Sequence, residues 1–145
     1  DEVVNQIMIN RGFLSTSPGT VFWNVAALDG SQLMSDVIAQ GVFQHQALLP
    51  ETPWIAAPEL AEVNVDMNYV GEDIQLTWSH PNSEQVSQLL VYLKYAQQWQ
   101  YHIYSSEEHV ISVKASDMQR PLKAVKVIAV DRLGNQSDEI ELLIK

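Results

Sequence analysis

Hydrophobic and polar residues change their spacing midway along this chain of 145 residues. Segments 3–11 and 33–38 carry apolar residues three and four positions apart, which is the period of an amphipathic helix. Segments 61–67 and 74–79 alternate apolar and polar residues, which is the period of a strand with one buried face. The pattern therefore predicts helices early in the chain and strands in the remainder.

Three prolines, Pro50, Pro53 and Pro58, mark the point where the spacing changes. Clustered prolines interrupt regular structure, because each lacks a backbone N–H and has a fixed φ angle. We therefore predict three parts: a helix-strand-helix segment at 1–50, a proline-rich linker at 51–58 and a β-sandwich at 59–145.

In the first part we predict a helix that ends at Gly12, in a left-handed conformation. A mostly apolar run, "TVFWNVAAL", follows it. Such a run is typical of a strand covered on both faces, and we place this strand at Thr20–Val25. Ser31 is a candidate N-cap for a second helix that extends to Gln40. The order is that of a βα-repeat protein, although one such unit cannot close a sheet.

The second part contains seven short runs with strand character, separated by turn sequences such as "HPNSE" and "DRLGNQS". This number of strands is expected of an immunoglobulin-like sandwich. The run "SQLLVYLKY" is apolar on both faces, with Leu90 and Tyr92 on the second face. Either this is a central strand with long apolar side chains on its outer face, or that face is covered, in which case the first part of the chain is the natural candidate.

Composition excludes several kinds of site. The chain has 18 acidic and 8 basic residues, a net charge of −10, and no basic patch in either half, which disfavours nucleic acid as a partner. The lack of cysteine excludes disulfides, thiolate catalysis and cysteine-based zinc sites. No nucleophile elbow or glycine-rich phosphate loop occurs, so we assign no catalytic residue and no cofactor.

Two groups of residues are candidates for binding. The four histidines lack the spacing of a zinc motif, and we predict no metal site. His102 and His109 have two interpretations, a surface metal site or solvated turn residues, of which we favour the second, and His80 is expected in a loop before Pro81. In "QWQYHIY", Trp99 and Tyr101 fall on one strand face. This row has two interpretations: an exposed surface that stacks on sugar rings, or half of a sandwich core.

Residues 58–145 resemble a fibronectin type III domain. The resemblance rests on Trp78 in "IQLTWS", on "LLVY" ending at Tyr92, and on "VIAVDRLGNQS" at 127–137. One position departs from the family pattern, because Val125 stands where a tyrosine usually ties its hydroxyl to the backbone.

The order "GTVFWNVAAL", helix, "QALLPETPW", sandwich is similar to the end of the glycosyl-hydrolase-like family ten proteins. These are bacterial proteins, often exported or lipid-anchored, in which a (β/α)₈ barrel precedes a fibronectin-like domain. The resemblance implies that 1–12 is the barrel's seventh helix, Thr20–Val25 its eighth strand and 31–40 its last helix. Trp23 and Asn24 would then line a sugar site, although Trp23 has the alternative of packing between the barrel and its helix.

We therefore expect a piece of a longer, exported cell-envelope protein, with catalytic carboxylates on strands upstream of this chain. The piece itself is expected to be non-catalytic: its sandwich supports the barrel and contributes to glycan binding. The expected partners are the upstream barrel, a glycan, and a second copy bound through the N-terminal segment. The alternatives are a glycan- or protein-binding module, an architectural spacer, and a helical cap in place of the barrel remnant.

Overall fold

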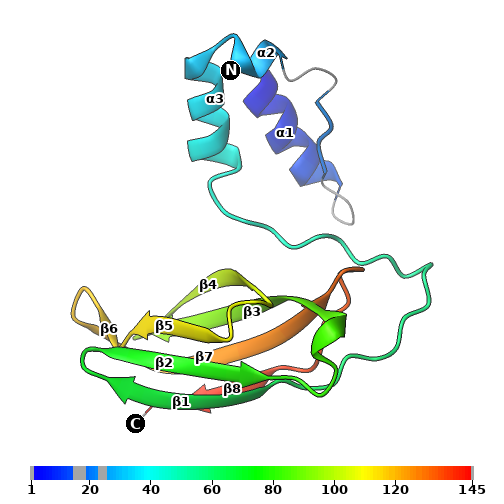
Figure 1. Ribbon diagram of the computed structural model, residues 1–145. Helices are drawn as coiled ribbons and strands as arrows, with labels where there is room; N and C mark the ends of the chain where they lie inside the picture. Colours follow the sequence, from blue (N-terminus) through cyan, green and yellow to red (C-terminus); the bar gives the residue numbers. More distant parts are fainter. Residues whose placement is uncertain (1, 15–18, 23–25, 145) are drawn as a thin grey trace. The chain divides into compact units, whose positions relative to one another are not determined.

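A computed structural model describes residues 2–14, 19–22 and 26–144, and the chain divides into two compact units (Figure 1). The first unit is Asp1–Ala47 and the second is Leu48–Lys145. The helices of the first unit are α1 (Glu2–Phe13), α2 (Ala26–Asp29), α3 (Gln32–Val37) and the π-helical turn η1 (Ile38–Val42).

The described part of the first unit is a small helical body. Helix α1 contacts η1, and each contributes one buried apolar side chain, Ile7 and Ile38. Ser31 is the N-cap of α3, as predicted, because its Oγ accepts a hydrogen bond from the Met34 amide at 3.4 Å. Gly12 does not end α1, which continues to Phe13. No helix in the described ranges is both long and apolar enough to cross a membrane.

The strand predicted at Thr20–Val25 is not found in the described part of that range. Residues 20–22 have no regular secondary structure, and 23–25, which include Trp23 and Asn24, lie outside the described residues. Residues 26–28, the end of the apolar run, belong to helix α2. A strand is defined by pairing with a neighbour, and the described part of the first unit contains no other strand with which this run could pair.

The second unit forms two antiparallel sheets. All seven predicted strands are present in its described residues, together with a short additional one, β6. The strands are β1 (Asn64–Val70), β2 (Asp73–Ser79), β3 (Val86–Tyr95), β4 (Gln98–Ser105), β5 (Val110–Lys114), β6 (Ser116–Asp117), β7 (Arg120–Asp131) and β8 (Ile140–Leu143), with a 3₁₀ turn η2 (Ser83–Gln85) before β3.

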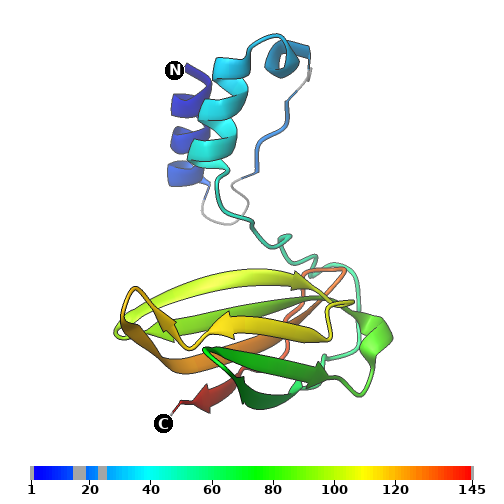
Figure 2. The ribbon, with the colours of Figure 1, turned by 60° about the vertical axis from the view of Figure 1, so that its left-hand side comes forward.

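The two sheets face each other as layers (Figures 1 and 2). One has the order β1-β2-β5; the other has the order β4-β3-β7, with β6 and β8 both pairing with β7. The inward residues of the central strands form the core, including Leu76, Trp78, Leu89 and Val125. The unit is therefore a fibronectin type III-like β-sandwich, and the chain is mainly β, as predicted.

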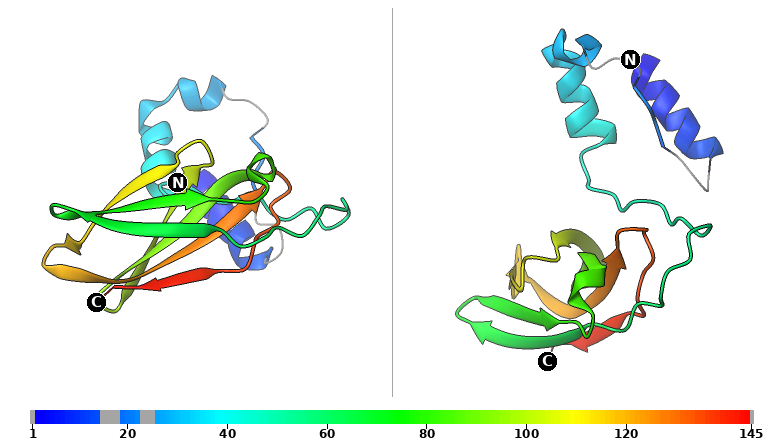
Figure 3. Two further views of the ribbon diagram at one scale, coloured as in Figure 1. Left: turned by 60° about the horizontal axis from the view of Figure 1, so that its bottom comes forward. Right: turned by 45° about the vertical axis from the view of Figure 1, so that its right-hand side comes forward.

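The proline-rich segment at 51–58 is part of the second unit (Figure 3). The Thr52 amide and hydroxyl both donate to the Leu133 carbonyl oxygen, at 3.0 and 3.1 Å. Leu133 lies in the turn between β7 and β8, which Asp131 stabilises by accepting hydrogen bonds from the Leu133 and Asn135 amides. Segment 48–58 is thus fastened to the sandwich at this turn.

Candidate functional site

The outward face of the sheet that contains β3 and β4 carries an unusual group of side chains. Strand β4 pairs with β3 so that Trp99 lies opposite Lys94 and Tyr101 opposite Tyr92. Since opposite residues of an antiparallel pair share a face, these four side chains lie on the same side of the sheet. The core residues Leu89, Val91 and Leu93 of β3 occupy the other side.

Three aromatic rings, Tyr92, Trp99 and Tyr101, form what we call the aromatic face. The ring centroids of Tyr92 and Trp99 are 6.4 Å apart with an interplanar angle of 89°, and those of Tyr92 and Tyr101 are 6.3 Å apart. These are the edge-to-face and tilted geometries that aromatic pairs favour. Trp99 is 41% exposed and Tyr101 is 43% exposed, whereas Tyr92 between them is partly buried.

Charged side chains border the aromatic face. The Nζ atoms of Lys94 and Lys126 lie 5.4 and 5.5 Å from the centroid of the Trp99 ring, within cation–π range. Lys126 also forms ion pairs with Glu139 at 2.7 Å and Glu141 at 3.8 Å. The hydrogen bond to Glu139 raises the pKa of Lys126, which therefore remains charged. Polar groups that can hydrogen-bond a ligand thus lie beside Trp99, whose ring can stack on it.

The core interpretation of Trp99 and Tyr101 is wrong, because both rings are exposed and lie outside the sandwich core. The sequence also left Tyr92, Lys94 and Lys126 unassigned to any site. Lys126 is brought to Trp99 by the pairing of β3 with both β4 and β7, which strand periodicity does not reveal. In one of its two interpretations, the face of β3 that carries Leu90 and Tyr92 is covered. At Tyr92, the rings of Trp99 and Tyr101 on β4 provide part of this cover. Covering by the first unit stays a prediction.

Three of the histidines, His80, His102 and His109, contact other protein groups. His80 is buried: its Nδ1 accepts from the Asn82 amide at 3.0 Å, so Nε2–H is the donor to the Ala61 carbonyl oxygen at 2.8 Å. The His109 ring lies 5.2 Å from that of Trp78, and the His102 ring 6.1 Å from that of Tyr104. Among the described residues, no three histidine or carboxylate side chains are grouped closely enough to hold a metal ion.

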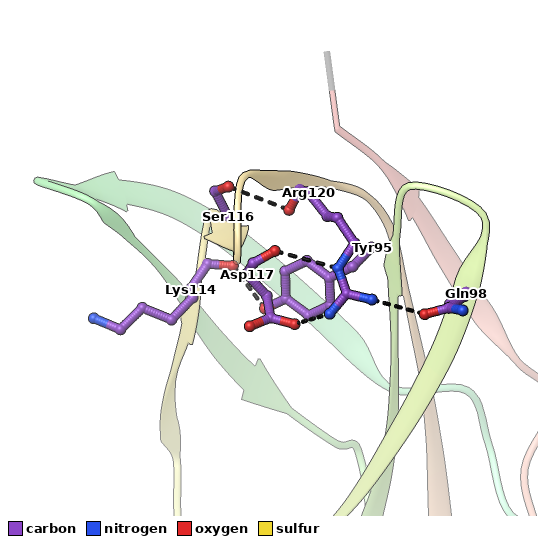
Figure 4. Close-up of polar contacts among 6 residues, drawn as sticks. All are labelled: Tyr95, Gln98, Lys114, Ser116, Asp117 and Arg120. Carbon is purple, nitrogen blue, oxygen red and sulfur yellow. Dashed lines mark hydrogen bonds and ion pairs between the residues drawn. The ribbon is translucent and has the colours of Figure 1, made fainter.

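A polar cluster connects the two sheets at one end of the sandwich (Figure 4). The Tyr95 hydroxyl on β3 donates to the Lys114 carbonyl oxygen on β5 at 2.7 Å, which joins one sheet to the other. Arg120 forms an ion pair with Asp117 and donates to the Gln98 side chain at 2.7 Å. The Tyr95 bond is thus a hydroxyl-to-backbone tie between the two sheets.

Replacing Tyr95 with phenylalanine is expected to cost about 1 kcal/mol of unfolding free energy, because one hydrogen bond is lost. Burial, followed by nearby Asp117, raises the pKa of Tyr95 above its ordinary value of 10.0. The folded state therefore holds this proton more tightly than the unfolded state. The associated stability is fully present below pH 10.0 and is lost as the pH rises through the folded-state pKa.

Urea unfolding between about pH 7 and pH 11 tests this expectation. Above the ordinary tyrosine pKa of 10.0 the parent chain should lose stability more steeply than Tyr95→Phe. Tyr104, whose pKa is also raised by burial and then by Glu108, will still contribute to the decline in the variant. Identical slopes for the parent chain and the variant would show that Tyr95 makes no such contribution.

The second unit also contains three hollows away from the aromatic face. A groove of about 250 Å³ lies between β4 and β5, lined by residues that include Gln100, His102 and Ser112. Two others, of about 340 and 380 Å³, border segment 53–60 and are lined partly by that segment itself. The aromatic face combines exposed rings with neighbouring charged side chains, so it remains the better candidate site.

Comparison with known proteins gives structural neighbours only. No family model matches the chain, and no curated protein matches it significantly. It is similar in structure to pectate lyase PelI from Erwinia chrysanthemi, solved with tetragalacturonic acid, at 16% identity and a TM-score of 0.44 over 56% of this chain and 28% of that one. It is also similar to the fn3 domain of human contactin 1, at 16% identity and a TM-score of 0.40 over 74% and 90%.

Proposed function

We propose that this chain is a non-catalytic glycan-binding module whose ligand stacks on Trp99 and Tyr101. The observation that supports this function is the joint exposure of the two rings on one face of β4. The C–H face of a sugar ring is apolar and packs against an aromatic ring, while its hydroxyl groups need polar partners. Here Lys94 and the pair Lys126–Glu139 lie beside the rings as such partners.

The aromatic face lies on the outside of a sheet, whereas sites for small molecules are concave and enclose most of the ligand. An open face suits an extended polysaccharide that touches several rings in succession. We therefore propose an oligosaccharide or polysaccharide chain as the ligand, in preference to a free monosaccharide.

Replacing Trp99 with alanine is expected to weaken binding to a polysaccharide about tenfold, since a stacked ring contributes about 0.5–1.5 kcal/mol beyond its buried area. Tyr101→Ala should weaken it by a similar amount. Affinity electrophoresis in native gels containing soluble polysaccharides measures this effect. Trp54→Ala is the control, because Trp54 is 79% exposed but lies in the proline-rich segment. Equal retardation of the parent chain and all three variants in every gel would refute the proposal.

A second proposed role is support of a preceding domain. In line with the resemblance to glycosyl-hydrolase-like family ten, we propose that the chain is the C-terminal region of an exported bacterial protein whose barrel lies upstream. Two observations favour this role: segment 48–58 is fastened to the sandwich through Thr52, and apolar side chains of the first unit such as Met8, Phe13 and Leu33 are exposed. Burial of these side chains against a preceding domain would remove their apolar surface from water.

Hydrogen exchange tests the supporting role. The amides of α1 (Glu2–Phe13) should exchange at least about tenfold more slowly in a longer polypeptide that includes the upstream barrel than in this chain alone. Slower exchange of the isolated chain at rising concentration would instead identify a second copy as the partner of the N-terminal segment. Equal exchange under all these conditions would exclude both partners.

A further inference from the structure

Strand β4 (Gln98–Ser105) is an edge of its sheet, and among the strands that the structure describes it pairs with β3 alone. Its eight residues pair with β3 without a register shift, so no bulge interrupts the strand. In an antiparallel sheet, every second residue of an edge strand turns its backbone N–H and C=O away from the neighbour. Strand β4 therefore offers a row of backbone groups to another strand over most of its length; at its end, the Ser105 amide and carbonyl oxygen already bond to Glu108.

The sequence of β4 lacks the features that normally protect such an edge. Natural edge strands are short, or carry a charge, a proline or a bulge that prevents pairing with another molecule. Strand β4 reads QWQYHIYS and contains no acidic, lysine, arginine, proline or glycine residue. Each of the other edge strands in the described part of the chain has a charged residue: Asp66 in β1, Lys114 in β5, Asp117 in β6 and Glu141 in β8.

We infer that β4 pairs with β4 of a second copy of this chain, antiparallel and across a two-fold axis. In two-fold pairing a strand meets its own sequence, so any charge on it would lie near the same charge of the other copy. Strand β4 is the edge that avoids this cost, in a chain whose net charge of −10 otherwise opposes self-association. Neutrality along one edge of an acidic protein thus favours the chain itself as the occupant.

The pairing would also extend the aromatic face. With the two-fold axis at Tyr101, Trp99 lies opposite Ile103 of the second copy, and Gln100 lies opposite His102 of the second copy. Outward residues remain outward in both copies, because opposite residues of an antiparallel pair share a face. Two aromatic faces then form one continuous surface, on which a polysaccharide can bind both copies with increased avidity.

Sedimentation equilibrium of the full chain, with a charge-swap pair of variants, tests the inference. The parent chain should approach twice its 16.3 kDa mass as its concentration is raised into the millimolar range. Gln100→Lys/His102→Lys places lysines opposite one another and should weaken the dimer at least about tenfold, as should Gln100→Glu/His102→Glu. An equimolar mixture of the two variants should restore the dimer, because each lysine then faces a glutamate.

The matched control is Asn68→Lys/Val70→Lys, which adds the same charges at exposed positions of the edge strand β1 and should leave the dimer unchanged. Because two acidic copies repel each other, added salt should strengthen the dimer. A chain that stays monomeric throughout the concentration range would overturn the inference. A dimer that survives both double variants would also overturn it, and would point to the N-terminal segment as the interface.

Discussion

Replacing Trp78 with alanine is expected to lower the free energy of unfolding of the sandwich by about 3–5 kcal/mol, the range for deleting a buried tryptophan side chain. Trp78 is 5% exposed and belongs to the core between the sheets. Its Nε1–H donates to the Glu108 carbonyl oxygen at 2.7 Å, which anchors the loop before β5. The variant loses this anchor as well as the packing.

Urea denaturation followed by far-ultraviolet circular dichroism measures the effect. Trp54→Ala is the matched control, because its ring lies largely in solvent; its effect should stay within about 0.5 kcal/mol, as for other surface substitutions. If Trp78→Ala cost less than about 1 kcal/mol, the ring would not be a central core residue, and the assignment of β2 as a central strand would fail.

The second large effect is expected at Gly134, where two constraints coincide. Its φ angle is +83°, and a Cβ at this position would lie 2.8 Å from the Pro50 carbonyl oxygen and 2.9 Å from that of Leu49. Gly134→Ala should therefore cost about 1–2 kcal/mol for the left-handed backbone and about 1–3 kcal/mol more for displacing the segment at Pro50.

Gly71 separates these two contributions. It has a φ angle of +63°, and a methyl group added at this position would meet no atom within 4 Å, so Gly71→Ala should show the backbone cost alone. Hydrogen exchange at the Thr52 amide, which donates to Leu133, reports on the docking of segment 48–58. The amide should exchange at least about tenfold faster in Gly134→Ala and remain unchanged in Gly71→Ala. Equal protection in both variants would show that the segment does not depend on Gly134.

The sandwich was predictable because its signals are local. Strict alternation, as in Ile74, Leu76 and Trp78, places every second residue in the core, and turn sequences separate the runs. An element of two residues is too short to produce such a local signal and was not predicted. Strand β6 (Ser116–Asp117) is too brief to show a period, and it exists because Met118 and Gln119 adopt left-handed conformations that let the chain reverse.

The aromatic face was only half predictable. Alternation puts Trp99 and Tyr101 on the same side of β4, but it cannot say which side faces the core when both sides carry aromatic residues. That choice is made by sheet pairing, which sets Tyr101 opposite Tyr92 on the outward face of β3. In the first unit, the apolar run after Thr20 was typical of a strand, but pairing depends on neighbours that local sequence does not specify.

The measurement that tests the central claim most directly is a ¹H–¹⁵N NMR titration of the chain with a panel of soluble oligosaccharides, following the indole N–H signals of its four tryptophans. If the aromatic face binds glycan, the Trp99 signal shifts with increasing ligand, while those of buried Trp78 and of Trp54 in the proline-rich segment stay in place. Shifts at Trp54 without Trp99, or no indole shift with any oligosaccharide, would contradict the proposed binding site.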